Sequence, residues 1–138
     1  MSLWVEYMQI FEYKDKPAYL MAMRDFAKLF KALSDETRIR ILKVLLEREC
    51  CVCEVMQALD ISQSRASRNL GMLDDAGFVR SRRDGLWIVY SVDEQKMNSY
   101  AAPLIELLRG SLVNEEIILQ DRERLSHAVR VGPRAIPK

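Results

Sequence analysis

The spacing of the apolar residues changes abruptly at Gly77. Before it, "QSRASRNLGMLDDA" has apolar residues at helical spacing, and Ser62 is a residue type that caps helix N-termini. After it, "FVRSRR" and "LWIVYSV" have the composition of strands, and Asp84-Gly85 between them predicts a two-residue hairpin turn. Gly77 itself suits the left-handed position that ends a helix. The chain is therefore expected to place a helix directly before a β-hairpin.

Further helices are expected on both sides of this unit. Apolar residues at helical spacing predict a helix from Met23 through Leu33, and Ser34 or Asp35 can cap the next one. A short helix follows through Val55, Met56 and Leu59. The order helix, helix, short helix, helix, hairpin is typical of a winged helix-turn-helix, mainly α with a small β-hairpin wing.

The region after the hairpin is expected to be helical again. Asp93 can cap a helix, Pro103 predicts a break near Ala102 with a new helical start there, and a broad apolar stripe continues to Ile118. The domain boundaries that follow are an N-terminal extension over 1–22, a winged helix-turn-helix DNA-binding and dimerisation domain over 23–128, and a disordered tail over 129–138.

Composition places the chain among ordinary globular domains. It has 138 residues, 49% of them apolar and 30% charged, with a formal net charge of +1, so total charge does not point to an acidic partner. No run approaches the roughly 18 apolar residues of a membrane span. The start "MSLWVEYMQIF" lacks the pattern of a signal peptide. We therefore expect a cytoplasmic protein without a membrane partner.

The helix after Ser62 has the pattern of a DNA-reading helix. Its apolar residues cluster on one side, and the opposite side is short, polar and basic, which suits a major groove. Arginines also crowd the hairpin, where a wing meets DNA. The candidate DNA contacts are Gln63, Ser64, Arg65, Ser67, Arg68, Arg82 and Arg83. The alternatives are a solvated helix face and, for the hairpin arginines, protection of an edge strand.

All three cysteines lie in the stretch "ECCVCEV", residues 49–55. Thiolates select soft or borderline ions such as trivalent arsenic or antimony, copper(I), zinc, cadmium or lead. On an ideal helix Cys51 and Cys53 point about 200° apart. They converge if Cys51 caps a helix that begins at Val52, with Glu54 completing a capping box. Cys50 shares a face with Cys53 only if the helix begins earlier, so the ligands are either all three thiols or the pair.

Three segments together resemble the ArsR/SmtB family of metal- and metalloid-responsive repressors: "FKALSDETRIRILKVLLERE", "CVCEV" and "ISQSRASRNLGMLDDAGFVRSRRDGLWIVYSV". The resemblance implies a homodimer joined by its first and last helices and bound to a double-stranded DNA operator near a resistance operon. It implies arsenite or antimonite as the inducer at Cys51 and Cys53, with no permanently bound cofactor. Met56 stands where arsenic-sensing relatives often carry a further cysteine.

These observations predict a DNA-binding repressor, not an enzyme, that trivalent arsenic or antimony releases from its operator. The family's other metal sites are not matched, because His127 is the single histidine and residues 1–49 hold no cysteine. An alternative is a repressor that senses oxidation through its thiols. A thiol enzyme is disfavoured by the absence of a Cys-x5-Arg motif and of a βαβ pattern. A winged-helix module that binds protein is a further alternative.

Overall fold

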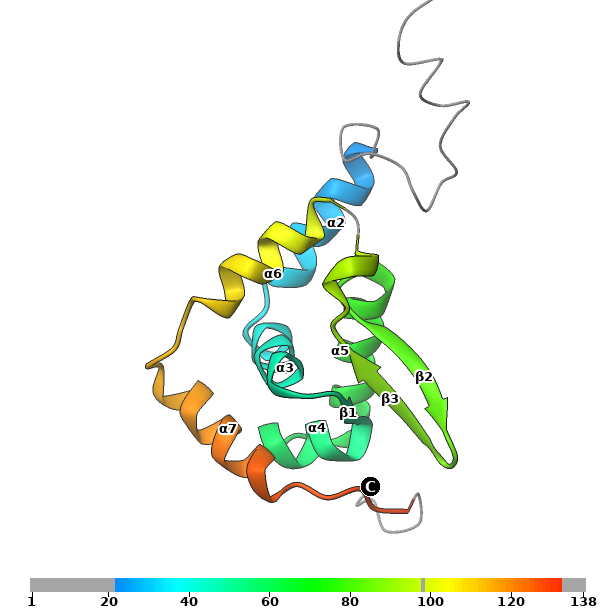
Figure 1. Ribbon diagram of the computed structural model, residues 1–138, viewed down its shortest axis with the longest axis vertical. Helices are drawn as coiled ribbons and strands as arrows, with labels where there is room; N and C mark the ends of the chain where they lie inside the picture. Colours follow the sequence, from blue (N-terminus) through cyan, green and yellow to red (C-terminus); the bar gives the residue numbers. More distant parts are fainter. Residues whose placement is uncertain (1–21, 98, 133–138) are drawn as a thin grey trace, which may run out of the picture.

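The computed structural model describes residues 22–97 and 99–132 and confirms the winged helix-turn-helix (Figure 1). Most of the predicted N-terminal extension therefore lies outside the described residues. The elements are α2 (Met23–Leu33), α3 (Glu36–Glu47), β1 (Cys50–Cys51), α4 (Val52–Leu59), α5 (Gln63–Ala76), β2 (Arg80–Asp84), β3 (Trp87–Ser91), the 3-10 helix η3 (Glu94–Lys96), α6 (Ala101–Arg109) and α7 (Glu116–His127). None of the helices in this part of the chain is long and apolar enough to cross a membrane.

The helix ends form where the local sequence predicts them. Asp35 caps α3 by accepting a hydrogen bond from the backbone N–H of Arg38 at 3.1 Å. Ser62 caps α5 in the same way, through the N–H of Arg65 at 3.2 Å. Gly77 ends α5 with a φ of 94°, a conformation that a residue without a Cβ adopts at little cost. These caps set where the helix-turn-helix starts and stops.

The wing is a three-stranded antiparallel sheet in the order β1-β3-β2. Asp84 pairs with Trp87, so the two-residue loop is Gly85-Leu86, one position later than predicted, and Gly85 takes the positive φ of 62°. The third strand, β1, was not predicted. It places Cys50 opposite Tyr90 and Cys51 opposite Val89, which joins the cysteine stretch to the wing.

The core lies among α2 to α6 and the inner face of the sheet. Large, fully buried side chains come from every one of these elements, among them Leu29, Ile41, Leu42, Val55, Leu70, Leu73, Phe78, Val89 and Ile105. The core-facing residues of α5 are those on the predicted apolar side, Ala66, Leu70 and Leu73. Burying them leaves the opposite face of α5 exposed.

The apolar stripe after Pro103 is not one helix. It is broken after Arg109, where the Lys43 ammonium donates to the carbonyl oxygens of Leu108, Arg109 and Ser111 at 3.1, 3.3 and 2.7 Å. A cation bound to the last carbonyls of a helix stabilises its end. The chain then turns, with Leu112 at a φ of 59°, and α7 returns along α3 and α4 (Figure 1).

A buried ion pair holds α7 in this position. Asp121, only 1% exposed, accepts from Arg40 Nε at 2.7 Å and Nη2 at 2.8 Å, and from Arg124 Nη2 at 2.7 Å. Arg40 also donates to the Leu59 carbonyl, and Arg124 to the Ala58 carbonyl, both at the end of α4. One carboxylate on α7 therefore fixes two arginines that each reach α4.

The tail expected to be disordered from residue 129 is instead hydrogen-bonded to the domain as far as Val131. Val129 and Gln57 exchange two hydrogen bonds, Arg130 pairs with Glu54, and the Val131 carbonyl accepts from the Trp87 indole. We call residues 128–132 the C-terminal strap. The remainder of the predicted tail, residues 133–138, lies outside the described residues.

Candidate functional site

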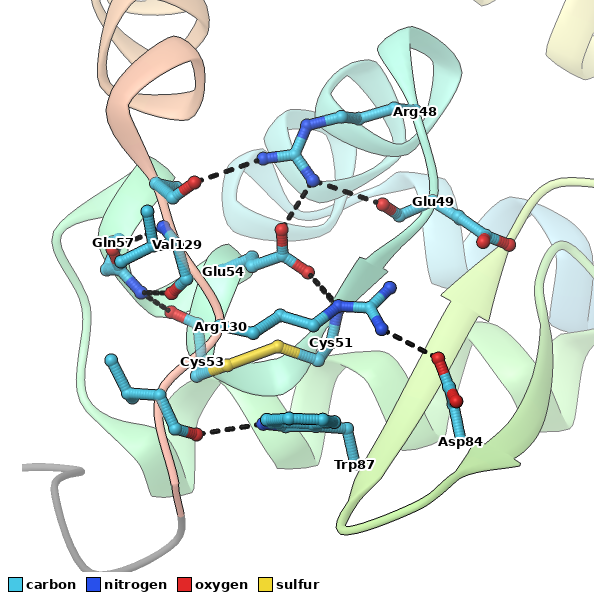
Figure 2. The surroundings of a disulfide bond; sticks show 12 residues. Arg48, Glu49, Cys51, Cys53, Glu54, Gln57, Asp84, Trp87, Val129 and Arg130 are labelled. Carbon is cyan, nitrogen blue, oxygen red and sulfur yellow. Dashed lines mark hydrogen bonds and ion pairs between the residues drawn. A yellow bond between two sulfur atoms is a disulfide. The ribbon is translucent and has the colours of Figure 1, made fainter.

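Cys51 and Cys53 meet at the N-terminus of α4 (Figure 2). Cys51 is the N-cap, with the extended dihedrals φ −78° and ψ 170°, and the helix begins at Val52. The two Cα atoms are 5.4 Å apart and the sulfurs form a disulfide. The sequence-based geometry, with Cys51 outside the helix and Cys53 in its first turn, is confirmed. Both side chains are buried, at 1% and 3% exposed.

Glu54 holds the turn that carries this pair. Its Oε1 accepts a hydrogen bond from the Cys51 N–H at 2.9 Å, as the predicted capping box requires. Arg48 and Arg130 both pair with the same carboxylate. Burial acts to raise the pKa of Glu54, but the Cys51 N–H and the two arginines outweigh it and lower that pKa below its usual range. Glu54 is therefore an anion fixed against the cysteine backbone.

Cys50 is not brought to the pair. Successive residues of a strand point to opposite faces, and Cys50 is wholly buried in the core, where its thiol donates to the Arg48 carbonyl at 3.5 Å. Burial raises the pKa of Cys50 to about 12, so the thiol stays protonated and is a poor ligand. Across residues 22–97 and 99–132, no three His, Cys, Asp or Glu side chains cluster closely enough to hold a metal ion. The roles of Cys50, Cys51 and Cys53 as ligands stay a prediction.

The predicted DNA-contacting residues lie on two exposed surfaces. Gln63, Ser64, Arg65, Ser67 and Arg68 are all exposed on the first two turns of α5. Arg82 and Arg83 are exposed on β2. The contacts of these side chains with DNA stay a prediction.

Two of these arginines are already fixed by protein contacts. Arg65 donates to the Thr37 hydroxyl at 2.7 Å, which fastens α5 to α3. Arg82 pairs with Glu49 at 2.6 Å, directly before the cysteines. Within the described part of the chain, the one contact of the Arg83 guanidinium is a 3.4 Å bond to the Gly85 carbonyl at the wing tip. The wing is thus linked to the cysteine stretch through a side chain as well as through β1.

Sequence reasoning missed the residues that brace this site from a distance. Arg38 donates to Asn69 on the underside of α5 at 3.1 Å and to the Ala32 carbonyl at 2.8 Å. Arg130 joins Glu54 to Asp84. A helical arginine and a basic tail both resemble ordinary surface sequence, so no local signal marks either residue. The side chains that these two arginines join to the site, Asn69, Glu54 and Asp84, lie 31 or more positions away from them.

The helix-turn-helix and cysteine segment match known regulators. Residues 35–81 match the family model described as bacterial regulatory protein, arsR family. The chain is 44% identical over 72 residues to a cadmium resistance transcriptional regulatory protein CadC homolog of Staphylococcus aureus, covering 51% of this chain and 60% of the relative. It is 37% identical over 100 residues to the arsenic resistance transcriptional regulator ArsR1 of Pseudomonas putida, covering 71% of this chain and 75% of the relative.

Solved structures support the same fold. Reduced HlyU from Vibrio cholerae is 32% identical, with a TM-score of 0.53, over 62% of this chain and 85% of that chain. The homodimeric winged helix-turn-helix domain of Mb0332 from Mycobacterium bovis, a possible ArsR-family regulator, is 26% identical, with a TM-score of 0.55. That match covers 79% of this chain and 89% of the Mb0332 fragment.

Proposed function

The chain belongs to the ArsR family of bacterial regulatory proteins, and on that premise we propose that it is a repressor released from operator DNA by trivalent arsenic or antimony. The choice of site rests on one observation: Cys51 and Cys53 converge at the start of α4, the helix that precedes α5. The name of the Pseudomonas relative supports arsenic, and the name of the Staphylococcus relative points to cadmium instead. We favour arsenic or antimony because two thiols suit a low-coordinate metalloid better than a tetrahedral cation.

The proposed binding step uses the reduced pair. Arsenous acid reacts with the two thiols, forming two As–S bonds and releasing two water molecules, while the third oxygen stays on arsenic. Side chains that meet in a disulfide already reach a common point, so one atom bridging them requires little backbone movement. The partial positive charge at the N-terminus of α4 favours the thiolates that this reaction needs.

The DNA-binding step uses α5 and the wing. The exposed polar and basic face of α5 enters the major groove, where arginine side chains bond base edges or phosphates. We propose a homodimer, which presents two such helices. Its interface would be built on α2 and α6, which expose apolar side chains including Phe26, Phe30 and Leu107, because α7 is packed against α3 and α4 of its own chain.

The test is a mobility shift on operator DNA with the reduced protein and arsenite. We expect arsenite to release the unmodified protein, whereas Cys51→Ser and Cys53→Ser should bind DNA normally and stay bound. Cys50→Ala is the matched control and should still be released, because its thiol faces the core. A thermal melt of each variant verifies folding. Release of both serine variants by arsenite would remove the site assignment.

The disulfide between Cys51 and Cys53 supports a second candidate function, in which oxidation replaces the metalloid. Two thiols and one peroxide would give one disulfide and two water molecules, and a dithiol reductant would reverse the step. The two candidates separate when peroxide and arsenite are added in different samples. Release by peroxide with no response to arsenite would favour the oxidation sensor.

A further inference from the structure

Three consecutive residues of the C-terminal strap attach to the surroundings of the cysteine pair (Figure 2). Val129 accepts from Gln57 Nε2 at 2.7 Å and donates its N–H to Gln57 Oε1 at 3.1 Å. The Val131 carbonyl accepts from Trp87 Nε1 at 2.8 Å. The strap is therefore fastened to α4 at one end and to the wing at the other.

Arg130, between these two attachments, joins α4 to the wing directly. Its Nε lies 3.2 Å from Glu54 Oε1 and its Nη1 lies 2.8 Å from Asp84 Oδ2. Its guanidinium carbon is 5.8 Å from the centre of the Trp87 ring, within the range of a cation–π contact. One side chain thus binds a carboxylate in the first turn of α4 and another at the end of β2.

The partners of the strap are also the partners of the cysteines. Glu54 Oε1 accepts from the Cys51 N–H as well as from Arg130. Gln57 Nε2 donates to the Cys53 carbonyl at 2.9 Å as well as to Val129. Because the same atoms hold the strap and the cysteine backbone, a displacement of one must disturb the bonds of the other.

We propose that the strap is a gate over the cysteine pair, closed by Arg130, and that occupation of the pair opens it. In the closed state both sulfurs are shielded from solvent and the wing is tied to α4. Opening exposes the sulfurs and removes the Arg130 link to Asp84. Only the coupling to metalloid rests on the proposed function, since shielding is a property of the protein alone.

The first test measures access to the sulfurs without arsenic or DNA. The reduced protein is treated with a maleimide, and the labelling of each cysteine is followed by mass spectrometry. Arg130→Met should raise the labelling rate of Cys51 and Cys53 by at least roughly tenfold. The loss of one hydrogen bond to a charged group already gives about that factor in an opening equilibrium, and this variant loses two. Cys50, buried in the core, is the internal reference and should stay unlabelled.

Two further variants make this test decisive. Asp84→Ala removes the carboxylate at the wing end of the link, together with its longer 3.9 Å ion pair to Arg82. It should raise the labelling rate in the same direction, so the gate can still be tested if Arg130→Met folds poorly. Arg122→Met is the matched control, because Arg122 is an exposed arginine of α7 paired with Glu47. Equal labelling rates in all four proteins would overturn the gate.

The second test follows the strap by hydrogen exchange after phenylarsine oxide is added to the reduced protein. The Val129 amide, which donates to Gln57, should exchange faster once the pair is occupied. If phenylarsine oxide binds Cys51 and Cys53 but the exchange rate of the Val129 amide does not change, the proposed coupling is wrong. If the reduced protein does not bind the arsenical at all, the proposed function is refuted. The gate is then tested by the maleimide labelling rates alone.

Discussion

Replacing Asp121 with alanine should weaken the attachment of α7 to the rest of the domain, because this carboxylate is the buried end of an ion pair. It is 1% exposed and bonds Arg40 twice, at 2.7 and 2.8 Å. Removing one partner of a buried pair costs about 3–5 kcal/mol, since the other charge is left without compensation.

The structure places the expected cost at the lower end of that range. The Arg40 side chain is 17% exposed and keeps its bond to the Leu59 carbonyl, so water and one acceptor remain available to it. The Arg124 side chain is 37% exposed and can be rehydrated. We therefore expect Asp121→Ala to lower the free energy of unfolding by about 3 kcal/mol.

Urea denaturation followed by circular dichroism measures this change. Glu123→Ala is the matched control on the same helix, and its exposed carboxylate, paired only with His127 among the described contacts, should change stability by less than about 0.5 kcal/mol. A loss below about 1 kcal/mol for Asp121→Ala would refute the reasoning, because it would mean that α7 is not held by this pair.

Two further predictions concern Glu54 and Arg68. The pKa of Glu54 is lowered on folding, so its stabilisation is present above its unfolded pKa of about 4.3 and is lost as pH falls through the folded value. Glu54→Gln should therefore be less stable than the unmodified protein at about pH 6, with a difference in urea midpoint that shrinks towards about pH 3; a constant difference would contradict this. Arg68→Ala should weaken operator binding and reduce the slope of log affinity against log salt by about 1, whereas Arg122→Ala on α7 should not. Equal slopes for both variants would remove Arg68 from the phosphate contacts.

Those parts of the fold that local chemistry determines could be predicted from the sequence. Asp35, Ser62 and Gly77 act through hydrogen bonds or backbone dihedrals within a few residues, so a short stretch of sequence is enough to predict the helix ends that they form. β1 could not be found, because two residues carry no periodicity and their pairing depends on β3, far along the chain. The break after Arg109 depends on Lys43, which lies 65 or more positions earlier.

The same distinction between local and long-range interactions explains which parts of the candidate site could be predicted. The convergence of Cys51 and Cys53 follows from a helix start at Val52, which is a local property. The separation of Cys50 from the pair follows from β1, and the pairing of β1 with β3 is not a local property. The sequence alone therefore could not exclude the three-thiol alternative. The attachment of Arg130 to Glu54 and Asp84 depends on the return of α7 to α4.

The two-residue strand β1 limits how this regulator can be redesigned for other ligands. Its two residues form the edge of the sheet, opposite Tyr90 and Val89, and one of them, Cys51, is itself a member of the cysteine pair. An inserted or deleted residue between Arg48 and Val52 would shift this pairing by one and turn each side chain to the other face of the sheet. A biosensor with altered selectivity should therefore be sought by exchanging side chains while the number of residues between Arg48 and Val52 stays fixed.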